Sequence, residues 1–511
     1  MNIKQKLLHF CLAIITAMTL LPKPAFADGE TGTEPPKDAD GYYLLDSAED
    51  LYWFSGFVNG RSNINDKVNA RLEADIDLNP GVSFAYNRET GKITISKGEK
   101  SFHLGSGLNG TVLGALDDGE TAFSLNPWTP IGTAAMTYAG TFDGNGHTVN
   151  GVYVNDENIG YAGFFGLIGD KNANNHYSGH VKNLTVGENS LILGYKCGGS
   201  GSTGGIAAMA MSIDTIANCV NRAAVVGRSS YVSFNSNASG VGMVGGIVGC
   251  MAGKAENCEN YGTVVSDNYA GGIAGNLTGG RTNTYAQAYV SLENCRNYGE
   301  VYGNEDLVSA TETSGHAGGI VGNSGGGDTA GCDGGIIAGC INFGKVRASG
   351  AAGVVYQARE GTRIKHCANR NEIAATLVSV GLVGQIDWGG CSLESSYNAG
   401  RVTLTGEGGK TAVAYPIAGL LKTFLGNSPS HTVQKCYNDS TVHPCEDNAL
   451  VGSNINMTAC YSVETSVFAT GEPAYKMGSW YDLRWKQNIP EPYEEGKIPE
   501  DYPNITGTRI V

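Results

Sequence analysis

The sequence predicts an all-β protein, a right-handed parallel β-helix with an N-terminal capping helix and a C-terminal cap. The first observation is an eight-residue motif that starts at residues 218, 257, 294, 339, 366, 395 and 435. In each copy, Asn stands two residues and Val or Ile six residues after the Cys position. The second observation is a Gly-apolar piece, such as Gly246-Ile247, that alternates with the motif. The third is the short interval between copies, 27 residues from Cys340 to Cys367.

A repeat of this length, with Gly and Asn at its turns and no helical period, is typical of a β-solenoid. One unit of roughly 25–28 residues would hold about three short strands. Each strand would pair with its copy in the next unit, so that rungs lie about 4.8 Å apart. A propeller is the alternative architecture, but its blades need uniform repeats of about 40–50 residues.

Residues 1–27 have the form of a secretory signal peptide. Two Lys precede the apolar run Leu7–Leu21, and small residues at its end place cleavage between Ala27 and Asp28. A membrane anchor is the alternative, but about 20 apolar residues are needed to span a bilayer and this run is shorter. We therefore expect a secreted or cell-surface protein with no membrane insertion after cleavage.

The rest of the chain divides into five segments. Ser47, with Asp50 three residues on, resembles a capping box, and the helical spacing of the apolar residues that follow predicts a helix over Ala48–Asn59. Runs at 84–86 and 92–96 predict a hairpin that projects from the body. The segments are a disordered lead at 28–40, an N-terminal cap helix with the first strands at 41–79, an inserted hairpin and loop region at 80–126, the β-helix repeats at 127–462 and a C-terminal cap at 463–511.

The Cys position of the motif predicts a ladder of buried thiols. Equivalent positions stack in successive rungs, so each Cys would face two neighbours equally, and Leu184 and Ser396 occupy the same position elsewhere. We interpret these Cys as small hydrophobic residues. A disulfide framework and a metal site are the alternatives, although the sequence has no C-x-x-C. The ladder would consist of Cys219, Cys258, Cys295, Cys340, Cys367, Cys436 and Cys460.

The Asn two residues after each Cys position predicts a second ladder. Its amides could hydrogen-bond along the rod while the backbone turns a corner, or they could form an outer row that binds a ligand. The apolar neighbours favour the structural ladder. The apolar residue three positions before the Cys, such as Ile216, does not fit simple alternation, which predicts a corner or bulge between the two. The ladder would consist of Asn221, Asn260, Asn297, Asn342, Asn369, Asn398 and Asn438.

The sequence contains no H-E-x-x-H or P-loop motif, so we expect no catalytic set, no metal and no cofactor. Glycan-cleaving β-helices use carboxylates from neighbouring rungs, and Asp267, Asp333 and Asp387 are the candidates beside repeat strands. Solvated surface acids are the alternative interpretation. Trp480 and Trp485 could stack on a sugar or cover the last rung.

The formal net charge of −15, or −18 without the leader, excludes a nucleic-acid partner, which requires a basic surface. It also disfavours an anionic membrane surface. Simple solubility accounts for the acidity. We expect a monomer that binds an unknown host or glycan ligand.

The alternating Gly-Gly-Ile-x-Gly and Asn-Cys-x-Asn-x-Gly-x-Val pieces resemble bacterial GLUG-motif proteins. Similar segments are Ser47–Val58 with Leu72–Leu78, Trp128–Gly132, Gly140–His147 and Trp485–Gln487. The resemblance implies a repeat architecture known from the non-catalytic part of some bacterial immunoglobulin A1 peptidases and from secreted surface proteins. The chain has no peptidase motif and no LPxTG sequence. We therefore expect a secreted, non-catalytic β-helix, an adhesin or ligand-binding scaffold acting through loops between rungs. A polysaccharide lyase or hydrolase is the alternative.

Overall fold

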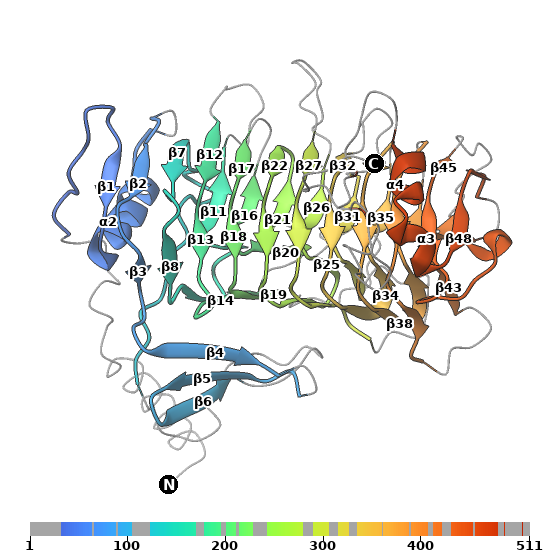
Figure 1. The fold of residues 1–511 in the computed structure, drawn as a ribbon. Coiled ribbons are helices and arrows are strands. Elements are labelled where there is room, and N and C mark those ends of the chain that lie inside the picture. Colours follow the sequence, from blue (N-terminus) through green and yellow to red (C-terminus); the bar gives the residue numbers. More distant parts are fainter. Residues whose placement is uncertain are drawn as a thin grey trace, which may run out of the picture.

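The protein is a parallel β-helix, and the predicted fold class is confirmed. In the computed structural model, long parallel sheets run from the N-terminal to the C-terminal end of a rod (Figure 1).

Within the described residues, no helix is both long and apolar enough to cross a membrane. The structure describes residues 32–63, 66–87, 90–104, 123–169, 178–195, 201–210, 214–227, 243–278, 290–305, 315–325, 335–359, 361–387, 390–406, 412–421, 431–452, 455–478, 485 and 503. Ala27, Asp28, Asp333 and Trp480 lie outside these ranges, as does the whole signal peptide.

One rung contains five short strands rather than the three expected from the sequence. The chain passes through sheet 1, then sheet 2, then twice through sheet 3 and finally through sheet 4. In the next rung each strand pairs in parallel with its copy. A complete rung consists of β22 (Lys254–Glu256), β23 (Glu259–Asn260), β24 (Val264–Ser266), β25 (Tyr269–Gly271) and β26 (Ala274–Leu277).

Sheets 1 and 2 are continuous along the rod and extend from the first rung to the last. Besides β22, sheet 1 consists of β1 (Tyr43–Leu45), β2 (Ala70–Leu72), β7 (Gly140–Asp143), β12 (Gly179–Lys182), β17 (Thr215–Ala217), β27 (Ser291–Glu293), β32 (Ile336–Ala338), β36 (Arg363–Lys365), β40 (Ser392–Glu394), β45 (Thr432–Gln434) and β47 (Met457–Thr458). Besides β23, sheet 2 consists of β3 (Ile76–Asp77), β8 (Thr148–Asn150), β13 (Thr185–Val186), β18 (Val220–Asn221), β28 (Arg296–Asn297), β33 (Ile341–Asn342), β37 (Ala368–Asn369), β41 (Tyr397–Asn398), β46 (Tyr437–Asp439) and β48 (Tyr461–Val463).

Sheet 3 has two series of strands, which merge in β34 (Val346–Ala352) and β38 (Ile373–Val380) and separate again in β42 (Val402–Leu404) and β43 (Val413–Tyr415). Its remaining strands are β9 (Tyr153–Asn155), β14 (Leu191–Gly194), β19 (Ala224–Gly227), β29 (Val301–Tyr302), β10 (Tyr161–Ala162), β15 (Ser202–Gly204), β20 (Met243–Gly245) and β30 (His316–Gly318). Besides β26, sheet 4 consists of β11 (Phe165–Ile168), β16 (Ala207–Ala210), β21 (Val248–Met251), β31 (Val321–Ser324), β35 (Val355–Ala358), β39 (Val383–Ile386) and β44 (Ala418–Leu421).

The interior of the rod contains two hydrophobic cores. The larger core holds the Cys column together with apolar columns such as Ile216 and Ile247. The smaller core lies within sheet 3 and consists of Val, Ile and Ala side chains, among them Val264 and Ala270. The Val or Ile at the end of the eight-residue motif therefore belongs to the smaller core in the middle rungs of the rod.

The helix α2 (Ala48–Asn59) covers the N-terminal end of the rod (Figure 1). Asp50 N–H donates to Ser47 Oγ (3.2 Å), and Ser47 Oγ donates to Asp50 Oδ2 (2.8 Å), so the two residues cap the first turn. Leu51, Phe54 and Val58 are buried against the larger core, which is the face that the helical spacing predicts. The open end of the first rung is thereby removed from water.

The insertion is a three-stranded antiparallel sheet, which we call the arm: β4 (Val82–Tyr86), β5 (Ile93–Lys97) and β6 (Lys100–Leu104). The predicted hairpin is its first two strands. The arm does not simply project from the body, because its apolar face packs on the outer face of sheet 3. There it joins Leu193, Val226, Val265 and Tyr302 in one hydrophobic cluster. These outward-facing side chains are at most 7% exposed.

The C-terminal helices, α3 (Thr465–Ala469) and α4 (Glu472–Met477), follow a short 3-10 helix, η1 (Asp447–Ala449). The sequence predicts a cap over the last rung. Among the described residues of this segment, Phe468, Met477 and Trp485 pack in one cluster with residues from four rungs of sheet 2, from Ile341 to Tyr437. The C-terminal segment therefore covers the flank of the last rungs.

Candidate functional site

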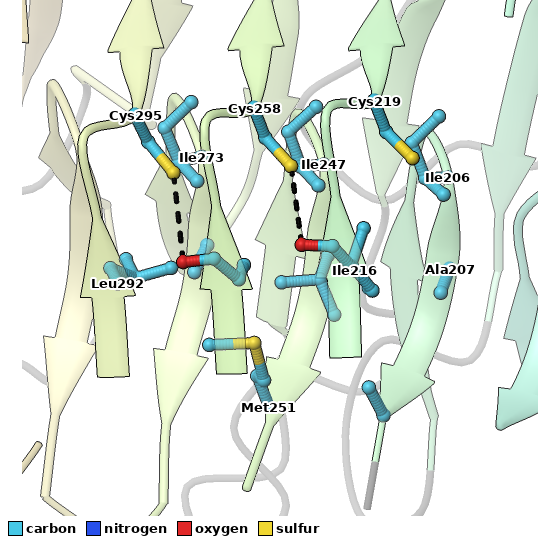
Figure 2. Close-up of a cluster of buried hydrophobic side chains, with 14 of the residues drawn as sticks. Ile206, Ala207, Ile216, Cys219, Ile247, Met251, Cys258, Ile273, Leu292 and Cys295 are labelled. Atoms are coloured by element: carbon cyan, nitrogen blue, oxygen red, sulfur yellow. Dashed lines mark hydrogen bonds between the residues drawn. The ribbon is translucent and has the colours of Figure 1, made fainter. Parts of the chain in front are cut away.

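The seven Cys side chains form one column inside the larger core. Six of the seven have no exposed surface, and Cys460 is 6% exposed. Figure 2 shows Cys219, Cys258 and Cys295 stacked in successive rungs beside the Ile column. Each thiol donates to the carbonyl two residues earlier, as from Cys258 to Glu256 (3.3 Å), and reaches a carbonyl of the preceding rung. All seven are free thiols.

The column's thiols lie inside the core, away from solvent. Burial raises the pKa of Cys436 well above the usual thiol value, because the thiolate would have no water around it. A low pKa and access to solvent are what make a Cys a nucleophile or a metal ligand. Within the described residues, no group of three or more His, Cys, Asp or Glu side chains could hold a metal ion.

The seven Asn side chains form a second, fully buried column. Asn260 Nδ2 donates to Asn297 Oδ1 of the next rung (2.8 Å) and to the carbonyl of Gly262 (2.9 Å). The same pattern runs from Asn221 to Asn398, and Asn438 donates to Ser462 Oγ at the end. The structure therefore places these amides inside the rod, where no ligand outside it reaches them.

The Asn column explains the Gly-apolar piece. A Cβ on Gly246 would lie 2.3 Å from Asn260 Cγ and 2.2 Å from the carbonyl oxygen of Gly272. Along the chain, Asn260 lies between Cys258 of the larger core and Val264 of the smaller one. The two repeated motifs therefore meet at the boundary between the two cores, where a buried amide takes the space that a Gly leaves.

The residue before each Cys forms the corner that the sequence left unassigned. Asn218, Asn257 and Asn294 have φ of 54°, 54° and 55°, in the left-handed region that Asn tolerates better than most residues. This turn lets both Ile216 and Cys219 point into the larger core. The Asn that precedes several of these Cys could have indicated the left-handed corner, but the sequence analysis did not use it.

A row of aromatic side chains follows the Asn column on the outer face of sheet 2. Tyr261, Tyr298 and Phe343 stack face to face, with ring centroids 4.6 Å and 4.9 Å apart. Arg222 lies over Tyr261 at one end of the stack and Arg370 lies near Phe343 at the other. Because the ring faces are occupied, only ring edges remain for a ligand, and sugars stack on ring faces. The row stabilises the rungs but does not form a sugar platform.

Two more candidates for ligand contact lie in occupied positions. The Trp485 side chain is 2% exposed, and its Nε1–H donates to the carbonyl of Ser395 (2.8 Å), so it cannot stack on a sugar. On sheet 1, Lys254 Nζ lies 2.7 Å from Glu256 and 3.8 Å from Glu293 of the next rung. Lys254 thus pairs with both carboxylates. A glycosidase needs two carboxyl groups that are available to the substrate and are not neutralised by a Lys between them.

Of the predicted candidate carboxylates, Asp387 is the one for which the structure describes a buried network of polar side chains. It follows β39 and is 5% exposed. Gln357 Nε2 donates to Asp387 Oδ2 (2.5 Å), and Arg359 Nε lies 3.3 Å from the same oxygen. Tyr269 Oη donates to Gln357 Oε1 (2.6 Å). Burial raises the pKa of Tyr269 to about 12, which keeps this hydroxyl a donor at neutral pH.

Asp267 lies between β24 and β25 and is half-buried; no described contact joins it to Asp387. The polar partners of Asp387 were not found from the sequence. The sequence feature that could have indicated them is the residue three positions after each Gly-apolar piece, which is polar in several rungs. Sheet 4 stacks these positions in register, and in successive rungs they are Cys250, Asn276, Asn323, Gln357 and Gln385.

Asp387, Arg359 and His431 all lie at the connections from sheet 4 to sheet 1, which we call the insertion corner. Its connections differ widely in length. Only Ala252 and Gly253 separate β21 from β22, whereas residues 278–290 separate β26 from β27. Residues 325–335 separate β31 from β32. The connection between the two strand series of sheet 3 also varies in length, from residues 267–268 after β24 to residues 228–242 after β19. The insertion corner is the candidate functional site because its variable connections lie beside a buried carboxylate.

No family model matches the chain, and no curated protein matches it. The likeness to GLUG-motif proteins therefore rests on the repeats alone. The chain is similar in structure to a putative immunoglobulin A1 protease from Bacteroides ovatus, solved as a crystal structure, with 15% sequence identity and a TM-score of 0.36. The match covers 92% of this chain and 94% of that chain. A likeness at this score carries no argument about activity or mechanism.

Proposed function

We propose that this protein is an extracellular, non-catalytic β-helix that binds a glycan or another host ligand at its insertion corner. The observation that best supports this proposal is that the rod is repetitive whereas the connections between its strands vary in length. The order of the sheets and the two ladders recur from rung to rung, whereas the connection from sheet 4 to sheet 1 ranges from two residues after β21 to residues 278–290 after β26. The connection between the two strand series of sheet 3 also varies in length. Binding residues are commonly carried by loops on a rigid scaffold.

The distribution of carboxylates supports binding rather than turnover. Glycoside hydrolysis uses two carboxyl groups about 5–10 Å apart on either side of the scissile bond. Asp387 is engaged by Gln357 and Arg359, and the surface pair Glu256 and Glu293 is bridged by Lys254. The extracellular location rests on the form of residues 1–27, and an export assay in a bacterial host tests it.

The experiment combines a glycan array with a reducing-sugar assay on the same oligosaccharides. We expect capture of one class of glycan and no release of reducing ends. Release of reducing ends, or of unsaturated products that absorb at 235 nm, would make the protein a polysaccharide-degrading enzyme. Capture of no glycan and of no host surface protein would contradict the proposal.

A further inference from the structure

The Cys column is interrupted once, and the interruption leaves one separate pair of thiols. Ser396 occupies the Cys position in the rung before Cys436, and Cys460 occupies it in the rung after. The β47 and β48 strands that flank Cys460 are the last in their sheets. Within the column, Cys436 and Cys460 therefore neighbour only each other, whereas the Cys from 219 to 367 follow one another in five successive rungs.

The backbone holds this pair at a separation that a disulfide can bridge. The strands on both sides of the two Cys are in register, β45 with β47 and β46 with β48. The preceding residues, Lys435 and Ala459, form the same left-handed corner, with φ of 52° and 54°. Neighbouring strands lie about 4.8 Å apart, within the 4.4–6.8 Å that separates the Cα atoms of a disulfide. Both side chains lie in the larger core, where the two thiols are hydrogen-bonded to each other.

The position of the pair at the end of the rod gives it a route to a reagent. Among the described residues, β47 and β48 pair with a strand on one side only. Strands at the end of an array open at a lower free-energy cost than those inside it. Cys460 is 6% exposed, and the hydrogen bond from Cys436 lowers its pKa. Opening of the last rung therefore presents a thiol that ionises readily.

We propose that Cys436 and Cys460 are a disulfide-forming pair, which gives a redox-controlled cross-link between the last two rungs. The oxidant is a disulfide of a small molecule or of a protein. The Cys460 thiolate attacks one sulfur of the oxidant, and the first thiol leaves. Cys436 then attacks the sulfur of Cys460, the bond between the two Cys forms, and the second thiol leaves. Two protein thiols are oxidised, the oxidant is reduced to two thiols, and both protons pass to these thiols.

The same chemistry is blocked in the rest of the column. The five Cys from 219 to 367 have no exposed surface, and the strands on either side of them are paired on both edges. A reagent reaches them only when interior rungs open. Cys445 is half-buried and is the competing thiol, because it lies between the two Cys in the sequence. The inference is independent of the proposed ligand binding.

The first test maps the bond in the full chain. Native, fully reduced protein is incubated with oxidised glutathione, its remaining thiols are blocked with N-ethylmaleimide, and its peptides are analysed by mass spectrometry. Cleavage after Tyr437 and Glu446 puts Cys436, Cys445 and Cys460 in separate peptides. We expect the loss of two thiols and one link, between Cys436 and Cys460. No link, a link to Cys445, or equally fast pairing among the other five Cys would overturn the proposal.

The second test measures what the bond does to the last rung. Tyr461 N–H donates to the carbonyl of Cys436 (3.0 Å), so its hydrogen exchange reports separation of the last two rungs. We expect exchange in peptides that contain Tyr461 to slow at least about tenfold on oxidation, because a cross-link removes chain entropy from the opened state. Dithiothreitol should restore the original rate. Unchanged exchange in protein whose link has been mapped would contradict a cross-link that holds the rungs together.

Two variants separate the pair from its surroundings. Cys436→Ser removes the pair and should fold, because Ser396 already occupies the same position one rung earlier and donates to the carbonyl of Glu394 (2.8 Å). We expect its circular dichroism to match the wild type and its hydrogen exchange not to respond to oxidised glutathione. Cys445→Ser is the matched control and should respond as the wild type does. Slower exchange in oxidised Cys436→Ser, or no response in Cys445→Ser, would overturn the assignment.

Discussion

At the scale of single residues, the rod depends on buried amides that are satisfied only by one another. Asn260 accepts from Asn221, donates to Asn297 and also donates to Gly262. Because these groups are away from water, removing one amide leaves two neighbours with an unpaired atom. The sequence shows this column plainly, since the Asn never changes type across the seven motif copies.

We expect Asn260→Ala to lower the free energy of unfolding by about 2–4 kcal/mol, because it opens a cavity and leaves buried polar groups unpaired. Urea denaturation followed by circular dichroism measures this loss. Asn257→Gly, in the same rung, is the control. It keeps the left-handed corner at φ 54° and should cost a few tenths of a kcal/mol. Equal losses for both variants would refute the buried ladder.

Two Gly→Ala substitutions should change the free energy of unfolding in opposite directions. In Gly246→Ala the new Cβ would lie 2.2 Å from a backbone oxygen and 2.3 Å from Asn260 Cγ, so we expect a loss of more than about 3 kcal/mol. In Gly56→Ala, within α2, the Cβ meets nothing within 4 Å, and the helix gains about 1 kcal/mol. Thermal unfolding of both variants tests whether close packing around Gly246 is the reason that the repeat has a Gly at this position.

The buried thiols predict a loss of stability in alkali. Burial raises the pKa of Cys391 from about 9 in the unfolded chain to about 11 in the folded protein. The unfolded thiol therefore ionises first, and stability falls as pH rises through the window from 9 to 11. The free energy of unfolding measured from pH 7 to pH 11 should decline less in Cys391→Ala. An identical decline in both proteins would contradict this origin.

At the scale of elements, the arm and sheet 3 depend on each other. Leu193, Val226, Val265 and Tyr302 point away from the interior of the rod, yet they are buried because the arm packs on them. Further along the same outward column lie Arg347, Ala374 and Thr403, of which Arg347 and Thr403 are polar and partly exposed and Ala374 is a small buried side chain. The apolar stripe therefore ends where the arm ends.

We expect Val265→Asp to release the arm, because the carboxylate would be buried without a partner. Limited proteolysis should then cut within residues 80–126, and binding of a fluorescent hydrophobic dye should increase. Thr403→Asp, in the same outward column but beyond the arm, is the matched control. Proteolysis of the arm at the wild-type rate in Val265→Asp would show that the contact does not hold it.

Periodic features could be predicted from the sequence, and features without a period could not. The repeats predict the rod, the Cys and Asn columns and the capping helix, because identical rungs repeat one environment. They did not show that β34 and β38 are continuous, nor that the ring of Tyr356 packs closely on Gly350 of β34. The Asp387 network joins Tyr269 to Gln357, 88 residues apart, and no local signal connects them.

At the scale of the whole molecule, the protein consists of a repetitive rod and the connections that the rod carries. Deleting residues 279–289 leaves Thr278 and Val290 between β26 and β27. Deleting 326–334 leaves Gly325 and Gly335 between β31 and β32. Each deletion restores a two-residue connection like that between β21 and β22, so the rod should fold without strain.

Glycan-array binding by this double deletion, measured beside the wild type, tests whether the insertion corner binds the ligand. We expect an unchanged circular dichroism spectrum, an unfolding temperature close to that of the wild type and loss of glycan capture. Full capture by the folded double deletion would contradict it, because the ligand would then be bound without the two longest connections of the insertion corner.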